Sequence, residues 1–97
     1  MQTLAIEGEL TIYNAGEQKT RFLAFLNSGE SLQINLAEVT EIDTAGLQLL
    51  ILIKRTATKA KKELSFVMHS DAVLDILELT RLATAFGDPV VLASLEA

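Results

Sequence analysis

Alternation of apolar and polar residues predicts strands in three segments of the chain. The segment 31–39 begins with strict alternation, which is typical of a strand with one buried face. The segment 3–12 alternates more loosely on both sides of Gly8, so we expect one strand that is broken or bulged at this glycine. The segment 63–69 is short and mainly apolar, and we expect a buried strand there.

Apolar residues spaced three and four apart predict helices between these strands. Asn14 precedes one such stripe as a candidate N-cap, with Glu17 at the position of a capping-box acid. The longest stripe starts after Asp43 and continues to about Lys62. A further helix follows Ser70 or Asp71, either of which can cap it.

The end of the chain is less well defined by its pattern. The segment 82–86 predicts a last short strand. Asp88 and Pro89 are typical of a helix cap and first helical position, which favours a terminal helix over 89–97. The pair Val90 and Val91 leaves a strand open as the alternative.

This order of elements predicts an α/β fold. We expect one small domain over residues 1–97, with a largely parallel mixed sheet of four to five strands and about four helices. In such sheets, functional surfaces gather where strands end and the next helices begin. The stretch IDTAGL, residues 42–47, lies at such a place.

Composition and charge narrow the classes of function. The 97 residues carry a formal net charge of −5, which disfavours nucleic-acid binding. The chain has no cysteine and no apolar stretch of membrane-spanning length, so thiol chemistry and direct membrane insertion are not expected. No metal-ligand spacing, catalytic triad or phosphate-binding glycine loop occurs, and we expect neither a cofactor, a metal nor an enzyme. The cytoplasm is the expected location.

The junction at Asp43 and Thr44 has two interpretations. Either side chain can cap the following helix by accepting a hydrogen bond from a first-turn amide, and local chemistry alone favours this. An exposed threonine hydroxyl at a helix N-terminus is also a favourable position for a phosphate. Gly46 allows a close approach of the backbone to another segment or to a ligand.

The long helix has more apolar residues than one buried stripe needs. We expect the sheet to bury one stripe, with a second group on other faces. The stripe consists of Ala45, Leu49, Leu52, Ile53, Thr56 and Ala60. The second group consists of Leu47, Leu50, Ile51 and Lys54, and we expect Leu50 and Lys54 to be partly exposed.

Three stretches resemble the STAS family, named for sulfate transporters and anti-sigma factor antagonists. They are GELTIYNA, LQINLAEVTEIDTAGLQLL and FVMHSDAVLDILELTRL, and the resemblance covers nearly the whole chain. It implies a STAS-like fold and a regulator of partner switching, two-component signalling or chemotaxis. Many antagonists of this family carry Asp where this chain has Thr11.

The resemblance implies that Thr44 accepts phosphate from a partner Ser/Thr kinase that is also an anti-sigma factor. Asp43, Ala45, Gly46 and Leu47 would frame this acceptor. The partner could also be a histidine-kinase-like regulator, and a phosphatase could reverse the modification. The expected docking surface consists of Thr11, Asn14, Leu47, Leu50, Ile51 and Lys54.

The same family resemblance leaves a second role open. Some members are small subunits of ABC-type lipid transporters, where they bind the ATPase and also carry Asp-Thr in the motif. The pair Asp43 and Thr44 fits this alternative as well.

Overall fold

The computed structural model describes residues 1–80 as three strands alternating with three helices. The strands are β1 (Gln2–Leu10), β2 (Ser31–Ile42) and β3 (Glu63–Val67). The helices are α1 (Ala15–Leu26), α2 (Thr44–Lys59) and α3 (Asp71–Thr80). The expected strand over 82–86 and terminal helix over 89–97 lie outside the described residues.

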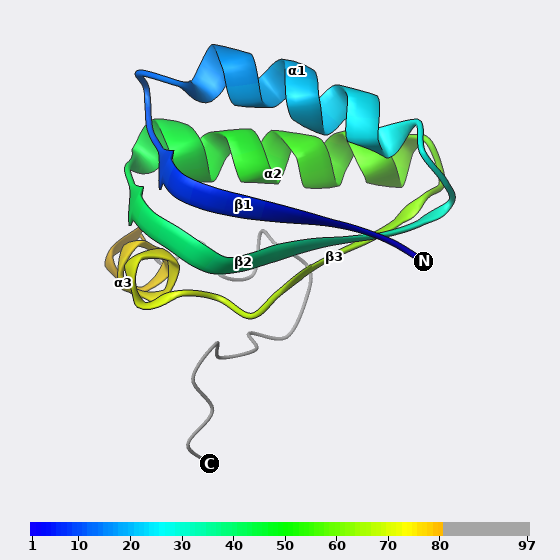
Figure 1. Cartoon of the computed structure of the whole chain (residues 1–97). Helices are drawn as coiled ribbons and strands as arrows, with labels where there is room; N and C mark the ends of the chain where they lie inside the picture. The colour runs from blue at the N-terminus through cyan, green and yellow to red at the C-terminus, as the bar shows by residue number, and fades with distance from the viewer. Residues whose placement is uncertain (81–97) are drawn as a thin grey trace.

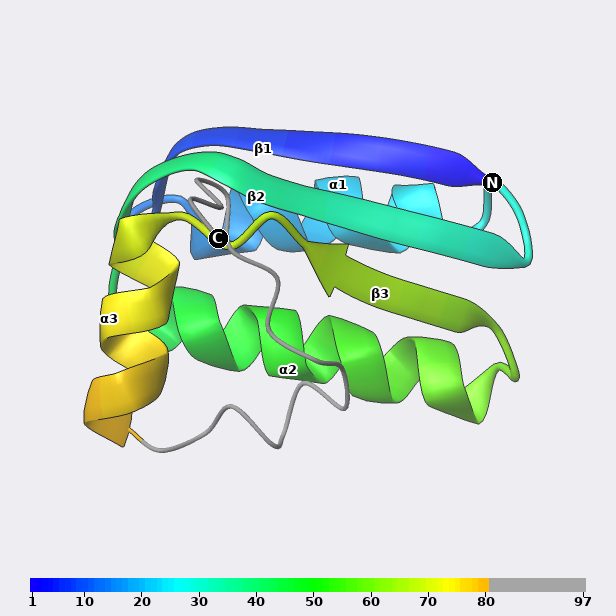
Figure 2. The ribbon, with the colours of Figure 1, turned by 90° about the horizontal axis from the view of Figure 1, so that it is seen from below.

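All pairing within the described part of the sheet is parallel, as the alternating order of elements predicted. The strand order is β1-β2-β3. Helices α1 and α2 lie side by side over one face of the sheet, and α3 lies on the opposite face near the carboxyl end of β2 (Figures 1 and 2). The predicted α/β class with a largely parallel sheet is therefore confirmed.

The core lies between the sheet and the helices. On β2 the expected alternation is present, and the three apolar side chains of its first half are buried. These side chains are Leu32, Ile34 and Leu36. They pack in a single cluster that also contains Phe22 of α1 and Ile53 of α2.

The expected irregularity of the first strand occurs on both sides of Gly8. Ala5 pairs with Asn35 but Glu7 pairs with Glu38, so β2 has one extra residue there, and the register shifts again after Gly8. Gly8 has a φ of +81°, a left-handed conformation that a side chain would disfavour. The extra residues at both shifts thus lie in β2, whereas β1 continues unbroken from Gln2 to Leu10.

Helix α2 ends at Lys59, three residues before the expected end. Lys61 has a φ of +60°, and Lys62 N donates a hydrogen bond to Ala57 O at 2.9 Å. This left-handed residue closes the last turn and directs the chain into β3. The cationic residues after Lys59 therefore belong to the connection rather than to the helix.

Candidate functional site

Asp43 joins two loops at the carboxyl ends of β1 and β2. Its backbone is extended, and its Oδ1 accepts a hydrogen bond from Gly46 N at 2.9 Å in the first turn of α2. Its Oδ2 accepts a hydrogen bond from Ile12 N, in the loop after β1, at 3.0 Å. Of the two residues that could cap α2, Asp43 is therefore the cap, and it also fixes the neighbouring loop.

These hydrogen bonds keep the Asp43 carboxylate ionised. The backbone N–H of Ile12, and next that of Gly46, lower the pKa of Asp43 below its usual value of 3.8. A full negative charge therefore lies at the start of α2 at neutral pH. It interacts favourably with the positive end of the helix dipole.

Thr44 is the first residue of α2, and its side chain is exposed. Several other threonines of the helices donate their hydroxyl hydrogen to the carbonyl four residues earlier, as Thr56 and Thr58 do at 2.9 and 3.0 Å. The Thr44 hydroxyl has no hydrogen bond within residues 1–80, since no turn of the helix precedes it. It is therefore accessible from solvent.

Gly46 places the start of α2 directly against the end of β1. A Cβ at this position would lie 1.9 Å from the carbonyl oxygen of Leu10 and 2.8 Å from its carbonyl carbon. Asp43 N donates to the same Leu10 oxygen at 3.4 Å. The expected close approach at Gly46 is thus an approach of two backbones, and it places Thr44 beside the loop after β1.

Asn14 stands at the N-cap position of α1, but its side chain does not cap the helix. Its Oδ1 accepts from Thr11 N at 2.9 Å, and its Nδ2 donates to Glu9 O at 2.8 Å. The expected capping function of this side chain is therefore wrong, because it binds the preceding loop instead.

Thr11 is buried, and its hydroxyl donates to Glu9 Oε1, so this side chain is not available as part of a docking surface.

Three apolar residues of the expected docking surface belong to the core. Leu47, Leu50 and Ile51 are buried, and the expected partial exposure of Leu50 is wrong. The reason is that α1 packs beside α2, so α2 is covered on two sides. Leu52, expected to face the sheet, is instead 41% exposed.

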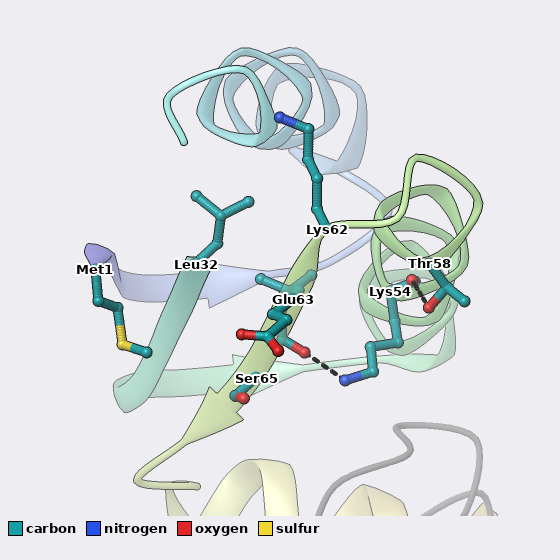
Figure 3. Close-up of a pocket in the computed structure, with 8 residues that line it drawn as sticks. Met1, Leu32, Lys54, Thr58, Lys62, Glu63 and Ser65 are labelled. Carbon is teal, nitrogen blue, oxygen red and sulfur yellow. Dashed lines mark hydrogen bonds between the residues drawn. The ribbon is translucent and has the colours of Figure 1, made fainter. Parts of the chain in front are cut away.

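Lys54 lies in the second half of α2, away from the first turn that contains Thr44. It is half-buried, and its Nζ donates to the Leu64 carbonyl of β3, as Figure 3 shows. It borders a cavity of about 410 Å³ near the amino ends of the strands, together with Lys62 and Glu63. The expected partial exposure of Lys54 agrees with the structure, but its position separates it from Thr44.

The exposed apolar side chains nearest to the junction are Ile12 and Tyr13. They lie in the loop after β1, next to Thr11, and are 67% and 90% exposed. The hydrogen bond from Ile12 N to Asp43 places this pair next to the start of α2. Neither residue was among the expected docking residues, and Ile12 was expected inside the first strand. The signal that was missed is the pair of large apolar residues in the stretch GELTIYNA, just before the helix start.

The described residues offer little for metal binding or for insertion into a membrane. Within residues 1–80, no group of three or more His, Cys, Asp or Glu side chains could hold a metal ion. None of the helices in this part of the chain is both long and apolar enough to cross a bilayer.

Ala45 is half-buried and follows Thr44 in the first turn of α2.

The fold of the described residues is that of a STAS domain. Residues 1–93 match the family model described as "Mlab, STAS domain", and the chain therefore belongs to the STAS family. The resemblance seen in its sequence motifs is confirmed.

Two solved structures similar to this chain are of anti-sigma factor antagonists. One is a protein of Thermotoga maritima, provisionally assigned as such an antagonist, with 26% identity and a TM-score of 0.75 over 92% of this chain and 76% of that chain. The other is the anti-sigma factor antagonist SpoIIAA in its unphosphorylated form, with 14% identity and a TM-score of 0.69 over 97% of this chain and 80% of that chain. The second likeness supports the fold alone.

Proposed function

We propose that the chain is a phosphorylation-switched interaction domain of the anti-sigma factor antagonist type, with Thr44 as the phosphoacceptor. The observation that carries this proposal is the exposed Thr44 hydroxyl at the start of α2, without a hydrogen bond within the described residues. Similarity to the Thermotoga maritima structure, provisionally assigned as an anti-sigma factor antagonist, supports the same role. The partner is a cytoplasmic Ser/Thr kinase that also serves as an anti-sigma factor.

The chemistry at Thr44 requires no catalytic group from this chain. Thr44 Oγ1 bonds to the γ-phosphorus of ATP as the bond to ADP breaks, and the hydroxyl proton passes to a base of the kinase. Asp43 contributes by fixing the start of α2 and the Ile12 loop in one arrangement. The kinase thus meets an acceptor on a rigid element.

The effect of the phosphate is electrostatic. It adds about −1.5 to −2 charges at neutral pH. The helix N-terminus attracts this charge and the ionised Asp43 repels it, so the fold changes little in stability. Beside Ile12 and Tyr13, however, the new charge disfavours the approach of an apolar partner surface. The unphosphorylated chain therefore binds its partner, and the phosphorylated chain releases it.

Phosphorylation in vitro tests the proposal. Purified Ser/Thr kinases of the anti-sigma class from the source organism are incubated with the chain and ATP, and the products are mapped by mass spectrometry. We expect phosphate on Thr44 and none on a Thr44→Val variant. Thr40→Val is the matched control, because Thr40 is also exposed but lies in β2 rather than at a helix start.

Binding measurements complete this test. A Thr44→Glu variant is expected to bind the same kinase more weakly than the unmodified chain. The proposal fails if none of these kinases modifies Thr44 and Thr44→Glu binds with unchanged affinity.

The second candidate function is that of a constitutive subunit bound to the ATPase of a lipid transporter. It is favoured by the pair Asp43 and Thr44, and by Thr11, which stands where many antagonists carry Asp and is buried and bonded to Glu9. Co-purification from cells separates the two functions. The transporter function is supported if an ATPase and a permease co-purify with the chain, and if they do so equally well with the Thr44→Glu variant.

A further inference from the structure

A groove lies between the end of β2 and α3, on the opposite side of β2 from α1 and α2. Its volume is about 310 Å³. From β2 it is lined by Thr40, Glu41 and Ile42, and from α3 by Ala72, Asp75, Ile76 and Leu79. Figures 1 and 2 show α3 against this end of the strand.

The apolar lining is arranged for contact with another molecule. Ala72, Ile76 and Leu79 are spaced four and three residues apart, so they form one stripe along α3. The core side of the same helix contains Val73, Ile76 and Leu77, which are buried, so Ile76 borders the groove from the core. Leu79 is 83% exposed, although it continues an apolar stripe. The apolar lining that α3 gives to the groove therefore extends from the buried Ile76 to the exposed Leu79.

The polar rim of the groove has one sign of charge. Glu41 and Asp75 are both exposed and line it from the two sides. Neither β2 nor α3 contains a lysine or an arginine. Most lysine and arginine residues of the described part of the chain lie instead near the carboxyl end of α2, around Lys59. The groove therefore lies in a negative field that favours a cationic partner.

We propose that this groove binds a segment of a partner protein in which one leucine-sized side chain is flanked by arginine or lysine. The apolar side chain fills the space between Ile42, Ile76 and Leu79, and the flanking cations face Glu41 and Asp75. This pairing of an apolar anchor with a charged rim gives the groove both its affinity and its choice of partner. Binding here does not depend on Thr44 being a phosphoacceptor.

The test is a titration of the ¹⁵N-labelled full-length chain with synthetic peptides. The probe is a short amidated peptide with one leucine between two arginines. In one control peptide serine replaces the leucine, and in the other glutamates replace the arginines. We expect saturable shifts of the backbone amides of residues 40–42 and 72–79 with the probe, and weaker binding of both controls.

Matched variants identify the residues responsible. Leu79→Ser is expected to raise the Kd of the probe about tenfold, since burial of one leucine contributes about that factor to affinity. Leu52→Ser, at the exposed position of α2, is its control and is expected to leave the Kd unchanged. Asp75→Lys is expected to raise the Kd several-fold, whereas Glu17→Lys, which changes the net charge equally on α1, is not.

Several results would overturn the inference. They are the absence of saturable shifts, shifts centred on Ile12 and Tyr13, and equal binding of the glutamate-flanked peptide. A dimer of the free chain that Leu79→Ser dissociates would assign the groove to a second copy instead. The Thr44→Val variant lacks the proposed phosphoacceptor and is expected to bind the probe normally. Failure of the groove proposal and failure of the phosphorylation proposal are therefore separate results.

Discussion

Gly46 stands so close to Leu10 that a Cβ at Gly46 would lie 1.9 Å from the Leu10 carbonyl oxygen. Neither backbone can move aside easily, because Asp43 binds both Gly46 N in the first turn of α2 and Ile12 N in the loop after β1. The site at Thr44 thus depends on the absence of a side chain two residues further on.

Replacement of Gly46 by alanine is therefore expected to destabilise the fold. Gly46→Ala should lower the free energy of unfolding by about 2–4 kcal/mol through this overlap. Gly16→Ala is the control, because a Cβ there meets nothing within 4 Å. It should raise the stability by about 0.5–1 kcal/mol. Urea denaturation measures both, and equal effects of the two substitutions would contradict the close approach.

Asp43 should make the stability depend on pH in the acid range. Its pKa in the folded chain is below 3.8, so its contribution is fully present above that value and is lost as the pH falls through the folded pKa. We expect Asp43→Ala to be less stable than the unmodified chain by about 1 kcal/mol at neutral pH. The difference should shrink below pH 3.8. Denaturation curves across this pH range measure the difference. If it did not change with pH, the ionised Asp43 carboxylate would not be the source of the stabilisation.

An asparagine at the same position separates charge from hydrogen bonding. Asp43→Asn has a single acceptor oxygen for the two N–H groups of Ile12 and Gly46, so it should lie between Asp43→Ala and the unmodified chain in stability. Since Asn does not titrate, this variant should also lack the acid-dependent part. If Asp43→Asn matched the unmodified chain at neutral pH, one of the two hydrogen bonds would be dispensable.

The two leucines Leu50 and Leu52 should respond very differently to truncation. Leu50 is fully buried, and Leu50→Ala should cost about 2–5 kcal/mol. Leu52 is 41% exposed, and Leu52→Ala should change the stability by less than about 1 kcal/mol. Thermal denaturation of the two variants measures this contrast. A larger loss for Leu52→Ala would reverse the assignment of the faces of α2.

Tyr13 should affect partner binding without affecting the fold. Because its side chain is 90% exposed, Tyr13→Ser should change the stability by less than about 0.5 kcal/mol. The affinity of the Tyr13→Ser chain for the kinase that modifies Thr44 should fall about tenfold or more, as expected for loss of an aromatic anchor. Isothermal titration calorimetry measures this, with Leu23→Ser of α1 as the control for an exposed apolar residue elsewhere. Unchanged binding by Tyr13→Ser would remove this loop from the docking surface.

The local patterns of the sequence were sufficient for the order of elements and for the junction. Alternation in β2 and the break at Gly8 depend on neighbouring residues, and both were predictable. The choice between Asp43 and Thr44 as cap was left open, because either side chain suits a helix start and only the three-dimensional path of the Ile12 loop distinguishes them.

The faces of α2 could not be predicted in the same way. Its sequence shows which residues are apolar, but not that α1 covers a second side of it, nor that Leu47 and Leu50 are buried. For the same reason most of the expected docking residues were placed on the helix. Thr11 and Asn14 were expected from the loop after β1, but Ile12 and Tyr13 between them were not. The side chain of Asn14 matched a capping pattern, but the Oδ1 atom that a cap would use accepts from Thr11 N instead. Its Nδ2 donates to Glu9 O, which holds the side chain in the preceding turn.

The hydrogen bond between Asp43 and Ile12 spans 31 residues of sequence. These two segments meet only after β1 and β2 have paired in parallel, which is a slow, non-local step of folding. A nascent or misfolded copy carries the same threonine but not the surface around it. A partner that recognises this arrangement therefore responds to the number of correctly folded molecules and ignores the rest.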